Sequence, residues 1–255
     1  MRASLRIVVA FLVAASWGSA FAEDLTLVWK TSGKTGPEGT RTQYISAHRM
    51  RNAEEGKDFI ADIAAGRITL IDHRKKEYSE ATVAEIEAAM QQAAARMQEM
   101  TDKMPPALRE KLALGVAPNL PVLVTKGATR KIAGYDAQQY TLSVGDSLKT
   151  EMWNTKELPL PVVDAGEFRK LAALGLVQMQ GMDKLVEEMK KVEGVSLAQS
   201  TSFKMMGHTS QTESEVTEVR KGPIPASTFD VAALAPGYKK VESPLTRMGA
   251  PGQRK

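Results

Sequence analysis

The chain has 255 residues, with 34 basic and 30 acidic side chains and no cysteine. The first 22 residues contain two arginines and no acid, so the remainder carries (34 − 2) − 30 = +2, too little charge to favour nucleic acid as a partner. The absence of cysteine excludes disulfides, thiol catalysis and thiolate metal sites.

The N-terminus has the pattern of a secretory signal peptide. Arg2 and Arg6 flank the start of an apolar run from Ile7 to Ala15, and Ala20-Phe21-Ala22 supplies the small residues that signal peptidase accepts. The run is too short for a membrane helix, and no cysteine follows the cleavage site. We therefore expect cleavage after Ala22 and a soluble periplasmic protein that neither spans the membrane nor is a lipoprotein.

Alternating apolar side chains predict strands in the first part of the mature chain. In Leu25–Lys30, for example, Leu25, Leu27 and Trp29 share one face. The further strands predicted here are Tyr44–Arg51, Asp58–Ile63, Arg67–Asp72 and Lys75–Ser79.

The pattern then becomes helical between Thr82 and Met104, a stretch without glycine or proline. Thr82 is a suitable N-cap, and Glu85 completes a capping box. Apolar residues recur every three or four positions and predict one stripe, made of Val83, Ile86, Met90, Ala93, Met97, Met100 and Met104.

Strands return after a short predicted helix, Ala107–Leu114. They are Leu120–Thr125, Thr129–Ala133, Gln138–Val144 and Leu148–Asn154, then Val195–Met206 and Ser210–Arg220 after a helical region, Asp164–Val192. Short turns between strands require antiparallel pairing. The prediction is an α+β fold, a curved antiparallel sheet with helices on its concave face. We expect one domain, residues 23–242, and a disordered tail, residues 243–255.

Three groups of segments resemble a known family. The first is Ile68–Tyr78, a strand, a charged turn and a tyrosine. The second is Ile132–Tyr140 with Glu151-Met152-Trp153 and Leu158-Pro159-Leu160-Pro161, and the third is Phe229-Asp230 with Pro236–Val241. Together they resemble the exported bacterial family called domain of unknown function 4412, which is similar in fold to the lipoprotein carriers LolA and LolB. The resemblance implies a half-barrel wrapped around helices, with a cavity that can hold an apolar ligand. It implies no enzymatic reaction.

No catalytic or metal-binding arrangement is evident. Histidines occur at positions 48, 73 and 208 without a second ligand at metal spacing, and there is no Gly-x-Ser-x-Gly motif. We expect no enzyme activity, no resident metal and no cofactor.

The 13 methionines allow three interpretations. They could pack between helix and sheet, line a pliable apolar pocket, or bind Cu(I) through the pairs Met97/Met100 and Met179/Met182. The function expected first is an exported binding or chaperone-like protein that holds a lipid or an acyl chain, including that of a lipidated protein, in the half-barrel groove. The residues predicted to line the groove are Trp29, Ile86, Met90, Met97, Met100, Met104 and Trp153. The alternatives are an envelope module that binds a protein partner and a periplasmic copper-binding protein.

Overall fold

The computed structural model describes residues 23–32, 38–105, 121–145, 148–158, 187–205 and 208–247. The predicted signal peptide, the predicted helix Ala107–Leu114 and most of the predicted helical region Asp164–Val192 lie outside the described residues.

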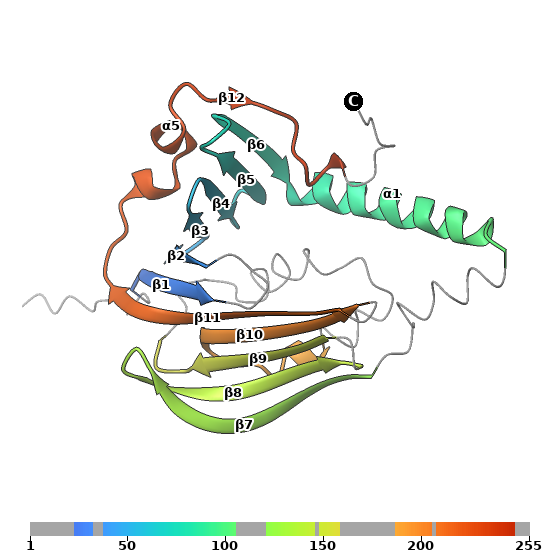
Figure 1. Ribbon diagram of the computed structural model, residues 1–255. Helices are drawn as coiled ribbons and strands as arrows, with labels where there is room; N and C mark the ends of the chain where they lie inside the picture. The colour runs from blue at the N-terminus through green and yellow to red at the C-terminus, as the bar shows by residue number, and fades with distance from the viewer. Residues whose placement is uncertain are drawn as a thin grey trace, which may run out of the picture.

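The described strands form one twelve-stranded sheet (Figure 1). Their order is β12-β6-β5-β4-β3-β2-β1-β11-β10-β9-β8-β7, and all neighbours are antiparallel except β12 and β6. The strands are β1 Leu25–Ser32, β2 Gly39–Ser46, β3 Arg49–Glu54, β4 Lys57–Asp62, β5 Arg67–Asp72, β6 Glu77–Thr82, β7 Val122–Ile132, β8 Tyr135–Val144, β9 Leu148–Thr155, β10 Val195–Met205, β11 His208–Lys221 and β12 Lys239–Lys240. The helices whose bounds lie within the described residues are α1 Val83–Asp102, the 3-10 helix η1 Ala226–Phe229 and α5 Val231–Leu234. The predicted α+β fold with a curved antiparallel sheet is confirmed.

The sequence pattern divides the chain into strands wrongly at two places. The predicted strand Tyr44–Arg51 is two strands, because β2 ends at Ser46 and β3 begins at Arg49. The turn between them contains Ala47 and His48, which are not among the usual turn residues. Conversely, the two strands predicted at Leu120–Thr125 and Thr129–Ala133 correspond to one strand, β7 Val122–Ile132, which continues through a bulge at Gly127 and Ala128. The carbonyls of both bulge residues accept hydrogen bonds from Gln138 Nε2, at 2.7 and 3.0 Å.

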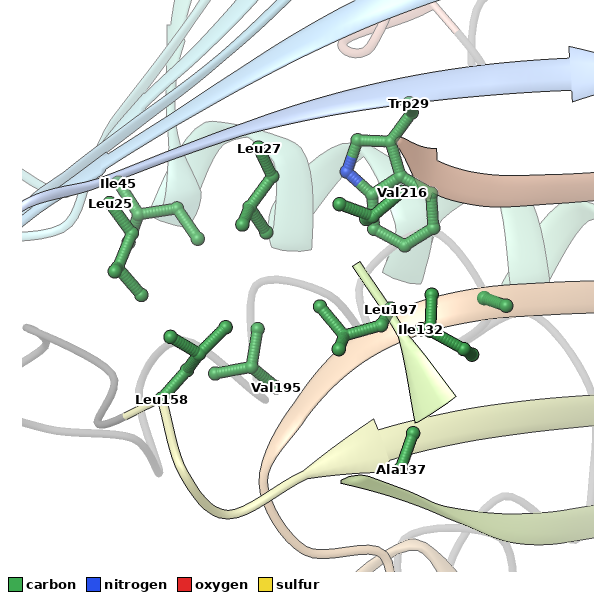
Figure 2. Packing of buried hydrophobic residues seen from close by; sticks show 11 residues of the cluster. Leu25, Leu27, Trp29, Ile45, Ile132, Ala137, Leu158, Val195, Leu197 and Val216 are labelled. Atoms are coloured by element: carbon green, nitrogen blue, oxygen red, sulfur yellow. The ribbon is translucent and has the colours of Figure 1, made fainter. Parts of the chain in front are cut away.

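The core lies inside the curve of the sheet. Figure 2 shows Leu25, Leu27 and Trp29 of β1 facing residues of the other half of the sheet across this interior. The buried cluster comprises Leu25, Leu27, Trp29, Ile45, Ile132, Ala137, Leu158, Val195, Leu197, Ala198 and Val216. The two halves of the sheet, β1–β6 and β7–β11, therefore pack against each other. Within the second half, an ion pair from Arg130 on β7 to Glu215 on β11, at 2.7 Å, joins two strands that are not neighbours in the sheet.

Strand register defines which side chains of β1–β6 share this inner face. Residues paired directly across an antiparallel ladder lie on the same face. From the core residue Leu25, the pairs continue through Ile45, Met50, Ala61, Ile68 and Ala81. We call this side the inner face of β1–β6 and the opposite side the outer face.

Helix α1 begins on the inner face. Its N-terminus has the predicted capping box, in which Thr82 Oγ1 accepts from Glu85 N at 3.2 Å and Thr82 N donates to Glu85 Oε2 at 2.7 Å. Ile86 and Met90 in the first two turns pack on Ile68 and Ala81. The expectation of a helix on the concave side therefore holds for the start of α1.

Residues 222–247, which we call the C-terminal strap, pass from the outer face to the inner face around the β6 edge. On the outer face, Phe229 and Ala235 pack on Ile60 and Ile71. The strap then pairs with β6 through β12, and Leu245 packs against the inner-face cluster of Ile86 and Met90. Figure 1 shows this path from α5 over β12 to the start of α1. Since Ser243 is 4% exposed, packed structure extends into the predicted tail; residues 248–255 lie outside the described residues.

Candidate functional site

The two tryptophans predicted to line a groove belong to the core. Trp29 is 4% exposed, and its Nε1 donates to Gln43 Oε1 at 3.3 Å. Trp153 is half-buried against the same cluster, and the guanidinium carbon of Arg130 lies 4.6 Å from its ring centroid. These aromatic side chains help to fill the interior between the two halves of the sheet.

The predicted residues of α1 do not share one environment. Ile86 and Met90 are buried, at 3% and 7% exposure, whereas Met100 is 62% exposed. Met104 is half-buried, and the side chain of Met97 lies outside the described residues. The structure brings Ile86 and Met90 together with the sheet but does not bring Met100 to it.

A pocket of about 640 Å³ lies beside this helix contact. Its sheet lining consists of residues that the register places on the inner face of β3–β6: Asn52, Glu54, Lys57, Phe59, Leu70, Asp72, Glu77 and Ser79. The strap contributes Val241, Glu242, Pro244 and Arg247. The remaining lining residues are Lys75 in the β5–β6 turn and Asp58, Ile71 and Tyr78, which alternate along the strands with inner-face residues.

One end of the pocket is apolar. Phe59 and Leu70 are directly paired across β4 and β5. Phe59 also packs against the buried cluster that contains Ile86 and Met90. Val241 and Pro244 add apolar surface from the strap. The apolar end is thus continuous with the contact between α1 and the sheet.

The other end of the pocket is charged. The ladder pairs Glu54 with Lys57, Lys57 with Asp72, and Asp72 with Glu77. Asp72 Oδ1 accepts hydrogen bonds from the backbone N–H groups of Lys75 and Arg74, at 3.0 and 3.1 Å. The bond from Lys75, more than any other interaction, lowers the pKa of Asp72 below its ordinary value. This end of the pocket therefore offers charges of both signs.

Asn52 lies between the core and the pocket. Its Oδ1 is buried and has no hydrogen-bond partner within the described part of the chain. An unpaired buried acceptor costs stability, so a ligand group that donates a hydrogen bond at this place would offset that cost.

The pocket residues were not predicted from the sequence, although the sequence contains a pattern that indicates them. Alternate positions on four short strands carry the pairs Asn52/Glu54, Lys57/Phe59, Leu70/Asp72 and Glu77/Ser79. Each pair puts a charged residue two positions from a residue nearer the core, on the same face. Four neighbouring strands with charged residues on the core side indicate a face that is only partly covered.

The outer face of the same strands is closed by a polar cluster. Asp58 accepts from Arg51 Nη2 at 2.8 Å and contacts His73 Nε2 at 3.1 Å, and its side chain is 2% exposed. His73 Nδ1 contacts the hydroxyl of Tyr238 at 3.2 Å, and Arg51 Nη1 donates to the carbonyl of Thr228 at 3.0 Å. Both Tyr238 and Thr228 belong to the strap. The cluster therefore fastens the strap to the outer face.

Within the described ranges there is no group of three or more His, Asp or Glu residues placed to hold a metal ion. In the same part of the chain, no helix has both the length and the apolar character needed to cross a membrane.

The family model described as domain of unknown function 4412 matches residues 117–234. This match confirms the resemblance over β7–β11 and the first part of the strap. It contains the segments Ile132–Tyr140 and Glu151–Trp153, whereas Ile68–Tyr78 and Pro236–Val241 lie outside the matched range. A search of curated proteins finds no match.

Several solved structures are similar to this chain. An uncharacterized conserved protein from Thermus thermophilus has 7% identity and a TM-score of 0.45, covering 87% of this chain and 91% of its own. MucB of Pseudomonas aeruginosa, in its complex with MucA, has 10% identity and a TM-score of 0.38; the match covers 81% of this chain and 54% of MucB. A LolA superfamily protein from Nitrosomonas europaea has 6% identity and a TM-score of 0.25, covering 82% of this chain and 89% of its own.

Proposed function

We propose that this chain is an exported, non-enzymatic binding protein of the periplasm that holds an apolar ligand in the inner-face pocket. The expected ligand is the acyl chain of a lipid or of a lipidated protein. The observation that carries the proposal is the pocket of about 640 Å³ whose apolar end joins the buried cluster under α1. Small-molecule sites usually enclose roughly 300–1,000 Å³, so a pocket of this size suits part of an acyl chain.

The binding energy would come from burial of methylene groups against Phe59, Leu70 and the apolar residues of the strap. Each buried methylene contributes about 0.8 kcal/mol before the cost of ordering the chain. The site proposed here differs from the groove predicted from the sequence, because Trp29 is in the core and Met100 is exposed. Ile86 and Met90 belong to the buried cluster against which the pocket residue Phe59 packs.

Binding is tested first by native mass spectrometry of the protein purified from its own envelope. A lipid-sized adduct supports the proposal. A protein adduct would instead support the envelope partner-binding role, and a copper adduct would support the role of the methionine pairs.

The pocket itself is tested by titration of an apolar fluorescent probe against Leu70→Gln. Leu70 is half-buried on the inner face and lines the pocket, so the polar replacement should weaken probe binding severalfold. The matched control is Leu123→Gln, because Leu123 is 53% exposed on β7 and does not line the pocket. Equal affinities for the two variants, each shown by circular dichroism to be folded, would contradict the proposed site.

A further inference from the structure

The charged end of the pocket contains carboxylates and ammonium groups that alternate across neighbouring strands. Lys57 on β4 lies between Glu54 on β3 and Asp72 on β5, and Glu77 on β6 follows Asp72. All four residues line the pocket. The charges therefore form one row at the end of the pocket away from the α1 contact.

Part of this charge is already paired within the protein. Asp72 is held by backbone N–H groups and lies 3.9 Å from Lys75 Nζ. On the strap, Glu242 pairs with Arg247 at 2.8 Å. These groups stabilise the pocket wall and have less capacity for a ligand.

Glu77 and Lys57 are the charged residues of the row that are most available to bind a ligand. Within the described residues neither side chain makes a hydrogen bond or an ion pair closer than 4.0 Å, although the Lys57 charge acts on Asp72. Glu54 has a cation nearby, because it interacts electrostatically with Arg41. Strands β4 and β6 flank β5 in the sheet, so Lys57 and Glu77 lie about two strand spacings, or roughly 10 Å, apart.

A headgroup with a charge of only one sign would meet repulsion somewhere in this row. An anion near Lys57 would also be repelled by the carboxylates on both sides of it. A cation near Glu77 would leave the Lys57 ammonium group without a partner. A headgroup with an anionic oxygen and an ammonium group a few bonds apart can satisfy both residues at once.

We propose that the ligand is an amphiphile with a zwitterionic headgroup, whose anionic group binds Lys57 and whose ammonium group binds Glu77. This inference rests on the proposed function, since the acyl chain of the same ligand occupies the apolar end beside Phe59 and Leu70. It adds the chemistry of the headgroup, which the apolar end does not determine.

The test compares four ligands with the same alkyl chain, each below its critical micelle concentration: dodecylphosphoethanolamine, dodecyl phosphate, dodecylammonium and uncharged dodecyl maltoside. Isothermal titration calorimetry at low salt measures each affinity. We expect dodecylphosphoethanolamine to bind roughly tenfold more tightly than either singly charged ligand, the scale of one charge-assisted hydrogen bond.

Two variants test which pocket residue binds which charge of the headgroup. Lys57→Gln should weaken dodecyl phosphate and the zwitterion while strengthening dodecylammonium, and Glu77→Gln should do the reverse for the two singly charged ligands. Lys30→Gln and Glu87→Gln are the matched controls, since both residues are exposed and neither lines the pocket. The controls should leave the order of affinities unchanged.

The outcomes separate this inference from the proposed function. If all four ligands bind equally and Leu70→Gln weakens them all, the headgroup inference is wrong and the acyl-chain pocket stands. If dodecylphosphoethanolamine binds best but neither pocket variant alters its preference, the assignment to Lys57 and Glu77 is overturned. If none of the four binds, the proposed function fails, and this inference fails with it.

Discussion

The two faces of β3–β6 are built from the same strands but are covered differently. On the outer face the strap packs Phe229 against Ile60 and Ile71, and the cluster around Asp58 joins strand to strap. On the inner face, within the described residues, α1 packs on the sheet through Ile86 and Met90, and the pocket occupies the area beside them. One face is therefore specialised for stability, and the other retains a concave surface.

The difference follows from where the polar groups lie. Asp58 is buried, but it has two partners, Arg51 on the neighbouring strand β3 and His73 in the turn after β5, so its charge is compensated. The inner-face charges Lys57 and Glu77 face a pocket and have no such partner in the described chain. A polar group that is satisfied inside the protein indicates structure, and one that faces a pocket unsatisfied indicates binding.

The comparison predicts the largest stability loss on the outer face, for Asp58→Ala. Removing the carboxylate leaves Arg51, whose side chain is 14% exposed, without its partner, and breaking such a buried pair costs about 4 kcal/mol. Urea denaturation measures the loss. The control is Glu55→Ala, which breaks the ion pair to Arg74, in which both side chains are more than two-thirds exposed. Similar midpoints for the two variants would show that the outer-face cluster does not fasten the strap.

A second prediction concerns the limited cover that α1 gives the inner face. Ile86→Ala should cost about 3 kcal/mol, because Ile86 is 3% exposed and its truncation leaves a cavity against Ile68. Met100→Ala on the same helix should have almost no effect, since Met100 is 62% exposed. The unfolding free energies of both variants check this contrast. Comparable losses would mean that the far end of α1 contributes as much to the fold as its start.

Local features of the inner face were predictable from the sequence. The capping box at Thr82 and Glu85, the bounds of β5 and the start of α1 follow from residue spacing within a few positions. Gly134 lies between the predicted strands Thr129–Ala133 and Gln138–Val144, and its φ of 89° in the turn between β7 and β8 is a conformation that glycine adopts without strain.

The pocket and the strap could not be predicted in the same way. The pocket depends on the register of four strands and on residues such as Val241, which is far away in the sequence from Leu70. Residues 243–255 were expected to be disordered, but Leu245 packs on the inner face against the cluster of Ile86 and Met90. Trp29 was placed in the groove because alternation identifies its face but does not reveal that Val216 and Leu197 fill the space beside it. These outcomes depend on tertiary packing, which overrides local pattern.

The smallest predicted effect is at the N-terminus of α1, where the inner-face cover begins. Thr82→Ala removes the hydroxyl that accepts from Glu85 N and donates to Glu85 Oε2, so it should cost about 1 kcal/mol in urea denaturation. Gln91→Ala, at an exposed position in the middle of the same helix, is the comparison. An equal loss at both positions would mean that the capping box does not contribute specifically.

The same cap predicts how stability depends on pH. The hydrogen bond from the backbone N–H of Thr82, followed by that from its hydroxyl, lowers the pKa of Glu85 below its ordinary value. Because the folded-state pKa is the lower one, the stabilisation is complete above the unfolded pKa of about 4.3 and is lost as the pH falls through the folded value.

Glu85→Gln should therefore be less stable than the wild type at neutral pH, and the difference should shrink below about pH 4. Glu87→Gln, on an exposed position of the same helix, should show no such convergence, and thermal melts across this pH range distinguish the two. A constant difference between Glu85→Gln and the wild type would show that the ionised carboxylate is not what stabilises the start of α1.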